Sequence, residues 1–143
     1  MRVAVTGGSG KLGRAVVSEL LDNDYEVVNL DRVPSKDPRA AFTRIDFTDF
    51  GETVQALTAI DSRYEHVDGV VHLAAIPGPG MAPNATILAN NVISSYNVFA
   101  AAHAAHIKTI VWASSETLLS IDRARRVLGY EPRHSWRDEI VAG

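Results

Sequence analysis

Three glycines in the segment TGGSGKLG, residues 6–13, have the spacing that suits a bound pyrophosphate. Gly7 would allow a tight turn, Gly10 would let the backbone approach a phosphate, and Gly13 would let a helix pack closely on a strand. The amino end of that helix would add free N–H groups and a partial positive charge. Because the segment falls between an expected strand and an expected helix, it predicts a dinucleotide-binding loop rather than an ordinary turn.

The phosphate-binding loop of ATPases fits this segment poorly. That loop would need a Ser or Thr directly after Gly10 and Lys11, and a Gly five residues before Gly10. Leu12 and Val5 stand at those two positions. The ATPase alternative is therefore excluded.

An acidic residue follows the glycine loop at a distance that suits a ribose contact. Asp31 stands 18 residues beyond Gly13, close to the roughly 20 residues expected for a carboxylate that binds a ribose diol. A carboxylate there favours NAD over NADP because it would repel a 2′-phosphate, although Arg32 and Lys11 would weaken that preference. The alternative is that Asp31 is a solvated turn residue. For Asp46 two interpretations stay open, a contact with the adenine amino group and a cap for the next turn.

Short β-branched segments alternate with helical patterns, which is typical of a parallel sheet covered by helices. Strands are expected at residues 2–6, 25–30, 41–46, 68–74 and 108–114, and helices at 11–24, 50–60, 86–105 and 120–130, with a Gly/Pro loop at 76–85. In the first helix, the stripe of Leu12, Val16, Leu20 and Leu21 is expected to face the sheet. Right-handed crossovers then predict a doubly wound, Rossmann-type α/β fold with helices on both faces and strand order 3-2-1-4-5. Its ligand crevice should lie at the carboxyl ends of strands 1 and 4.

The composition narrows the possible partners and the compartment. With 46% hydrophobic and 22% charged residues and a net charge of −3, the chain fits a soluble, cytoplasmic domain that binds neither nucleic acid nor a membrane. It has no cysteine, which excludes disulfides and cysteine nucleophiles, and it has no apolar run of the roughly 18 residues that span a membrane. His103 and His106 have a spacing that could hold a metal, but no third ligand accompanies them, so no metal is expected.

Taken together, these segments resemble the extended short-chain dehydrogenase/reductase family, the NAD-dependent epimerase/dehydratases that act mainly on nucleotide sugars. The matching segments are TGGSGKLG, LDR, RIDFTD, VVHLAA, NNVISSYNV and VWASSE, in the family's order over residues 1 to about 118. The resemblance implies NAD as cofactor, with NADP less favoured. It also implies a small-molecule sugar or nucleotide-sugar substrate and an epimerase, dehydratase or dehydrogenase, that is, an isomerase or oxidoreductase.

The resemblance also implies roles for individual residues. The residues implied to bind the pyrophosphate are Gly7, Ser9, Gly10, Lys11, Leu12 and Gly13. Asp31, with Arg32 beside it, would hold the adenosine ribose, and Asp46 and Phe47 would bracket the adenine. Leu73, Ala74 and Ala75 would pass along the cofactor near the nicotinamide ribose, and Asn91 would face it from the long helix. Ser115 would be the catalytic residue that hydrogen-bonds the reacting oxygen of the substrate, next to Glu116, where dehydratases carry an acid.

One feature of the family is missing from the sequence. The family's base is the Tyr of a Tyr-x-x-x-Lys motif, whose phenol is made more acidic by the Lys and by the cofactor's positive charge. The residues at the Lys position after the four tyrosines are Asn29, Asp68, Ala100 and His134, so the 143 residues contain no such pair.

The residues after position 119 resemble the family's C-terminal ending. We therefore expect an NAD(P)-binding Rossmann domain over residues 1–119 and a C-terminal helix and tail over 120–143, with the Tyr/Lys helix and most of the sugar site omitted between them. The alternative to an enzyme is a non-catalytic dinucleotide-binding module, truncated or redox-sensing. An FMN-binding, flavodoxin-like domain would suit five strands but would leave Asp31 and the glycine spacing unexplained.

The long helix at 86–105 has more apolar surface than one sheet could cover. Its apolar residues that spread round more than one side are Ile87, Leu88, Val92, Ile93, Tyr96, Val98 and Phe99. The resemblance implies that this helix pairs with its counterpart, so a homodimer through residues 86–105 is expected.

Overall fold

A computed structural model of the chain describes residues 1–59 and 64–114. The chain divides into two units, Met1–Ala113 and Ser114–Gly143. The expected helix at 120–130, the domain boundary at 119 and the catalytic candidate Ser115 lie outside the described residues.

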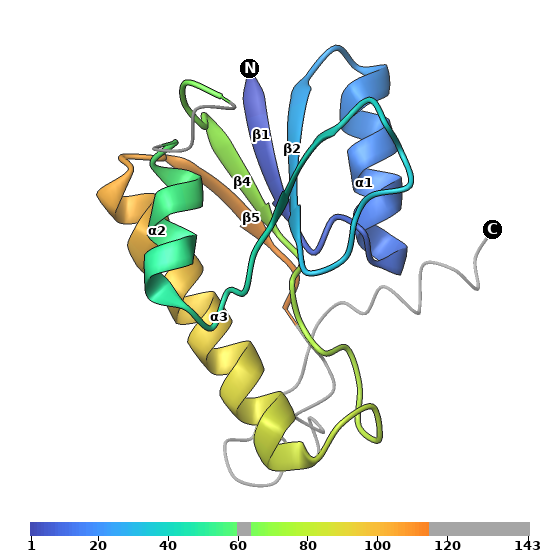
Figure 1. Cartoon of the computed structure of the whole chain (residues 1–143), viewed down its shortest axis with the longest axis vertical. Coiled ribbons are helices and arrows are strands. Elements are labelled where there is room, and N and C mark those ends of the chain that lie inside the picture. Colours follow the sequence, from blue (N-terminus) through green and yellow to red (C-terminus); the bar gives the residue numbers. More distant parts are fainter. Residues whose placement is uncertain (60–63, 115–143) are drawn as a thin grey trace, which may run out of the picture. The chain divides into compact units, whose positions relative to one another are not determined.

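The first unit is built on a five-stranded parallel sheet (Figure 1). The strands are β1 (Arg2–Thr6), β2 (Glu26–Asp31), β3 (Ala41–Arg44), β4 (Gly69–His72) and β5 (Thr109–Trp112), and the helices are α1 (Lys11–Asp22), α2 (Phe50–Leu57) and α3 (Asn84–Ala104). The strand order is β3-β2-β1-β4-β5, which confirms the predicted doubly wound fold. In register, Thr6 at the end of β1 lies beside Leu30 of β2 and His72 of β4.

Each face of the sheet is covered by its own helices. Figure 1 shows α1 on one face and α2 and α3 on the other. In β1, Val3 and Val5 belong to the core cluster under α1, whereas Ala4 belongs to the cluster under α2 and α3. Because strand side chains alternate between faces, a strand that is covered on both sides must be apolar at successive positions. The sequence of β1 meets this requirement.

Helix α1 packs on the sheet through three of the four residues of the predicted stripe, but not through Leu12. Gly13 and Val17 are buried, and Val16, Leu20 and Leu21 pack partly buried against the same cluster. Leu12 is 58% exposed, so the prediction that it faces the sheet was wrong. The buried stripe follows residues 13, 17, 20 and 21, which leaves the first-turn Leu12 on the outer side of the helix.

Helix α3 extends beyond the carboxyl ends of the strands (Figure 1). Its carboxyl half is packed on the sheet, where Val98, Ala101 and Ala102 are fully buried. Its amino half carries exposed apolar residues. None of the described helices is long and apolar enough to cross a membrane.

Candidate dinucleotide-binding site

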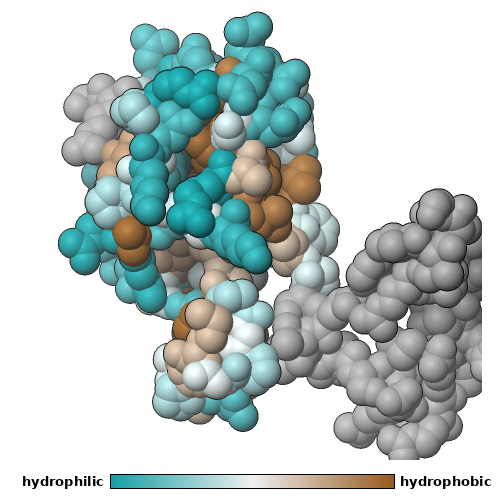
Figure 2. Space-filling view, turned by 90° about the vertical axis from the view of Figure 1, so that its right-hand side faces the viewer, coloured by the Kyte–Doolittle hydropathy of each residue, from teal (hydrophilic) through white to brown (hydrophobic). Residues whose placement is uncertain are grey.

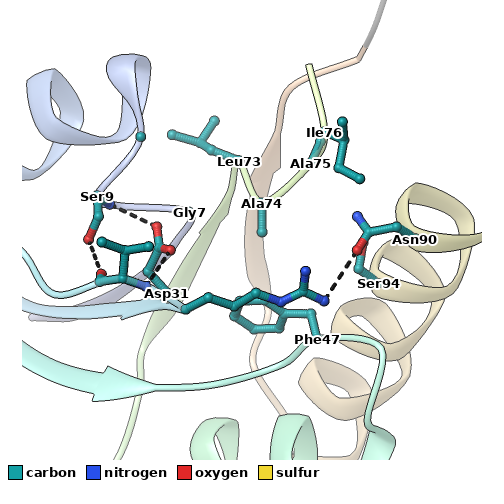
Figure 3. Close-up of a pocket in the computed structure, with 13 residues that line it drawn as sticks. Gly7, Ser9, Asp31, Phe47, Leu73, Ala74, Ala75, Ile76, Asn90 and Ser94 are labelled. Carbon is teal, nitrogen blue, oxygen red and sulfur yellow. Dashed lines mark hydrogen bonds between the residues drawn. The ribbon is translucent and has the colours of Figure 1, made fainter. Parts of the chain in front are cut away.

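A cavity of about 330 Å³ lies at the carboxyl ends of β1, β2 and β4, where the crevice was predicted. Its lining residues are Gly7, Ser9, Gly10, Asp31, Arg32, Val33, Phe47, Leu73, Ala74, Ala75, Ile76, Asn90 and Ser94. Figure 3 shows Ser9 and Asp31 on one side of this pocket, Asn90 and Ser94 of α3 on the other, and Phe47 between them. Lys11, Leu12, Gly13, Asp46 and Asn91, which the sequence also predicted as cofactor contacts, do not line it.

The glycine loop requires glycine for steric reasons. Gly7 has a φ of +68°, and a Cβ on it would lie 2.8 Å from the backbone nitrogen of Ala74. The Gly10 N–H donates to the Gly7 carbonyl at 3.0 Å, which closes the turn before α1. No side chain caps the first turn of α1, so its N–H groups can meet an anion.

The end of β2 is tied to the glycine loop through Asp31. Its carboxylate accepts hydrogen bonds from the backbone N–H of Ser9, at 3.0 Å, and of Val33, at 3.1 Å. A carboxylate offers about four acceptor positions, so both oxygens can accept further bonds from a diol. The Ser9 hydroxyl donates to the Val33 carbonyl at 2.6 Å. The loop is therefore held in place before any ligand enters.

Asn29 is a site residue that the sequence analysis missed. It is completely buried in β2, and its amide donates to the Ser9 hydroxyl at 3.0 Å. A side chain on Gly8 would collide with the same amide. The signal was a polar residue inside the apolar strand YEVVNL, because a buried amide inside a sheet needs a polar partner.

The carboxylate of Asp46 caps the turn after β3. Its Oδ1 accepts from the backbone N–H of Thr48 at 2.9 Å and from the Thr48 hydroxyl at 2.7 Å. The turn-capping interpretation is thereby confirmed, and the adenine contact stays a prediction. The Arg32 guanidinium also donates to Oδ1, at 2.6 Å, and this bond, helped by Thr48, lowers the pKa of Asp46 to about 2.

Beneath the pocket, Thr6 and His72 form a buried polar pair that the sequence did not predict. The Thr6 hydroxyl accepts from the N–H groups of Leu73 and Ala74, both at 3.1 Å, and lies 2.7 Å from His72 Nδ1. Because both lone pairs of the Thr6 hydroxyl oxygen are used, the hydroxyl donates its hydrogen bond to Nδ1. The imidazole proton is therefore on the other ring nitrogen, Nε2. Nε2 lies 3.2 Å from the Ser95 hydroxyl oxygen, which accepts a hydrogen bond from the Nε2–H group.

His72 supports the pocket without lining it. The residue is 4% exposed, and its ring makes edge contacts with the rings of Phe47 and Phe99. Burial lowers the pKa of His72 to about 4. The imidazole is therefore neutral near pH 7 and fixes, through Thr6, the backbone of Leu73 and Ala74.

Asn91 holds the loop after β4. Its Oδ1 accepts from the Ile76 N–H at 2.9 Å, and its Nδ2 donates to the Ile76 carbonyl at 3.1 Å. Asn90 and Ser94 are the residues of α3 that line the cavity. The structure thus places Asn91 as a support of the pocket, and a direct contact with a cofactor stays a prediction.

Comparison with known proteins gives one family and several relatives. The sequence profile of the NAD dependent epimerase/dehydratase family matches residues 3–125. The chain is similar to an NAD-dependent glucose-6-phosphate dehydrogenase of Haloferax volcanii, at 30% identity over 94% of this chain and 52% of that protein. It is also similar to a UDP-glucose 4-epimerase of Bacillus subtilis, at 28% identity over 85% of this chain and 38% of that protein.

A solved structure agrees with these relatives. A short-chain dehydrogenase/reductase superfamily protein from Agrobacterium tumefaciens, with bound NAD, superimposes with a TM-score of 0.68 at 29% identity, over 80% of this chain and 33% of that chain. The chain spans about half the length of these relatives, or less.

Proposed function

Because the chain belongs to the NAD-dependent epimerase/dehydratase family, we propose that it binds NAD in the pocket and serves oxidation–reduction chemistry on a sugar or nucleotide sugar. The observation that carries this proposal is one cavity that brings together the glycine loop, the uncapped amino end of α1 and the Asp31 carboxylate. The glycine loop and the amino end of α1 suit a pyrophosphate, and the Asp31 carboxylate suits a ribose diol. The relatives named above, a sugar-phosphate dehydrogenase and a nucleotide-sugar epimerase, support the substrate class.

Each part of the pocket has a task in this proposal. The backbone at Gly10 and the start of α1 bind the pyrophosphate, with Lys11, Leu12 and Gly13 shaping the loop. Asp31 accepts hydrogen bonds from the adenosine ribose, and the adenine lies against Phe47. Leu73, Ala74 and Ala75 line the path toward the nicotinamide, held in place by Thr6 and His72. When bound, NAD supplies a ring that accepts and returns a hydride.

Chemistry on a substrate also needs groups near the nicotinamide. We assign Ser115 as the residue that orients the reacting oxygen, within a cofactor-binding part that covers residues 1–119, and residues 120–143 as the C-terminal helix and tail. The sequence contains no Tyr-x-x-x-Lys pair for the proton transfer. This absence supports the second candidate, a dinucleotide-binding module without catalysis. Reduction of NAD in the presence of a sugar or nucleotide sugar by the 143-residue protein would rule out that candidate.

Replacing Asp31 by Asn tests the ribose contact. An amide keeps the shape of the side chain but has a single acceptor oxygen, so it binds a diol more weakly and places its NH2 group against the N–H of Ser9 or of Val33. We therefore expect the Kd for NAD, measured by isothermal titration calorimetry, to rise about tenfold. The matched control is Asp37→Asn, which also removes a carboxylate but lies outside the pocket in an ion pair with Arg39. Equal affinities of wild type and Asp31→Asn would contradict the ribose role.

We also propose a homodimer through α3. Leu88, Val92 and Tyr96 stand one helical turn apart and are 57%, 58% and 70% exposed. In the space-filling view, the lower end of the domain, where α3 begins, is more apolar and neutral in colour than the hydrophilic upper part (Figure 2). A row of exposed apolar side chains on one helix is typical of an association surface.

Val92→Glu tests this dimer. A charge in the middle of the row would be buried without a partner, so we expect sedimentation velocity to show a dimer for wild type and a monomer for the variant. The control is His103→Glu, an exposed position near the carboxyl end of the same helix, which should remain dimeric. A wild-type protein that stays monomeric at about 100 times the concentration used for binding would contradict the dimer.

A further inference from the structure

Arg32 is the cation closest in sequence to the carboxylate assigned to the ribose. It follows Asp31 directly at the end of β2, and both residues line the pocket. In dinucleotide-binding folds, an arginine near this point is the group that accommodates the 2′-phosphate of NADP. By sequence alone, Arg32 would therefore weaken the preference for NAD that Asp31 creates.

The structure shows Arg32 engaged elsewhere. Its guanidinium donates to Asp46 Oδ1 at 2.6 Å, and the same nitrogen lies 3.4 Å from Asn90 Oδ1 on α3. The first distance is that of a strong charge-assisted hydrogen bond, whereas the second is at the limit of hydrogen bonding. The ion pair with Asp46 thus decides where the guanidinium lies.

Asp46 is firmly held as the acceptor. Both the N–H and the hydroxyl of Thr48 donate to the same oxygen that receives Arg32. The Asp46 N–H donates to the Glu52 carboxylate at 2.8 Å, in the first turn of α2. A carboxylate that is fixed in this way holds its partner at less entropic cost than two mobile side chains would incur.

We propose that Asp46 determines the choice between NAD and NADP indirectly, by holding Arg32 in an ion pair and so withholding its guanidinium from a 2′-phosphate. This inference rests on the proposed binding of NAD in the pocket. Asp46 is then a specificity residue that acts through another residue. Its effect must appear in the ratio of the two affinities, because adenine, pyrophosphate and nicotinamide are common to both cofactors.

The test measures the Kd of NAD and of NADP for the 143-residue protein by isothermal titration calorimetry in a phosphate-free buffer. The quantity of interest is the selectivity ratio, the Kd of NADP divided by that of NAD. We expect a ratio above one for wild type and a ratio about two- to fivefold lower for Asp46→Asn, in which the amide oxygen keeps the Thr48 bonds but holds the guanidinium only by a weaker, neutral hydrogen bond. Asp46→Ser serves as a second variant if thermal unfolding shows that the first does not fold.

Two controls separate the proposed route from simpler effects of charge. Asp37→Asn removes the same charge from an ion pair outside the pocket and should leave the ratio unchanged. In an Arg32→Gln background, Asp46→Asn should no longer lower the ratio, because the group through which Asp46 acts is gone. A fall of the same size in both backgrounds would show direct repulsion of the phosphate by Asp46 and would overturn the inference.

The remaining outcomes distinguish the inference from the proposed function. If wild type binds NAD but Asp46→Asn leaves the ratio unchanged, or if wild type prefers NADP, the inference is wrong while the binding function stands. If wild type binds neither cofactor, the proposed function itself is wrong.

Discussion

Replacing Gly13 by Ala is expected to destabilise the protein by about 3 kcal/mol or more and to abolish NAD binding. Gly13 is the third residue of α1 and is buried. A Cβ at this position would lie 2.6 Å from the Cα of Gly8 and closer still to the Gly7 carbonyl oxygen. Both are backbone atoms of the glycine loop, so no side chain can rotate away, and either α1 or the loop must move.

The sign of this effect makes it diagnostic. At an exposed position inside a helix, Gly→Ala stabilises a protein by up to about 1 kcal/mol, because alanine has the higher helix propensity. A large loss at Gly13 therefore reports contact with the loop rather than any property of the helix. Urea unfolding and calorimetric titration with NAD measure the two effects.

Gly78→Ala is the matched control for this substitution. A Cβ at Gly78, in the loop before α3, would have nothing within 4 Å. The same chemical change there should alter the free energy of unfolding by less than about 0.5 kcal/mol. If Gly13→Ala is as stable as this control and still binds NAD, then close packing of α1 on the loop is not what the third glycine provides.

The sheet and the pocket's location could be predicted because they depend on simple rules. Apolar runs such as RVAVT and DGVVHLA mark strands that are buried on both faces, and right-handed crossovers fix the order of parallel strands. The crevice then follows from the point where the winding reverses. The positions of Gly7, Gly10 and Asp31 in the cavity follow in turn, since Gly7 comes directly after β1, Gly10 comes directly before α1 and Asp31 ends β2.

The remaining parts of the site depend on angles and distances that a sequence pattern does not contain. Whether Asn90 or Asn91 faces the cavity depends on the rotation of α3 about its axis, and neighbouring helical residues point about 100° apart. The bond between Arg32 and Asp46 joins the ends of two strands, and its partners stand 14 positions apart in the chain. Sequence spacing predicted neither contact.

Sequence spacing did not predict the contact between Thr6 and His72 either. This contact makes the free energy of unfolding depend on pH. The two residues are opposite each other in the register of β1 and β4, which becomes evident only once these strands are known to be neighbours. Protonation of Nδ1 would place a second donor against a hydroxyl whose lone pairs already accept from Leu73 and Ala74. The folded protein therefore disfavours the charged imidazole for two reasons, burial and hydrogen bonding.

The free energy of unfolding should accordingly fall by about 3 kcal/mol between pH 7 and pH 4 because of His72 alone. The pKa of His72 is lowered from 6.5 to about 4 in the folded protein. Between these two pH values, the unfolded chain therefore binds a proton at His72 and the folded chain does not. Stability from the neutral ring is therefore complete above pH 6.5 and is lost as the pH falls toward 4. Carboxylates with lowered pKa values, such as Asp46, lose their contribution only below about pH 4 and do not overlap with this range.

Urea unfolding at several pH values between 7 and 4.5 measures this dependence, and His72→Asn isolates its source. Asparagine offers the Thr6 hydroxyl an acceptor in place of Nδ1 but does not titrate. The free energy of unfolding of the variant should therefore be lower than that of wild type at pH 7 and should fall much less as the pH decreases. His103→Asn, at an exposed position of α3, should retain the wild-type decline. Parallel curves for wild type and His72→Asn would mean that the ring accepts a proton without opening the contact with Thr6. In that case the hydrogen bonds to Leu73 and Ala74 would not depend on a neutral imidazole.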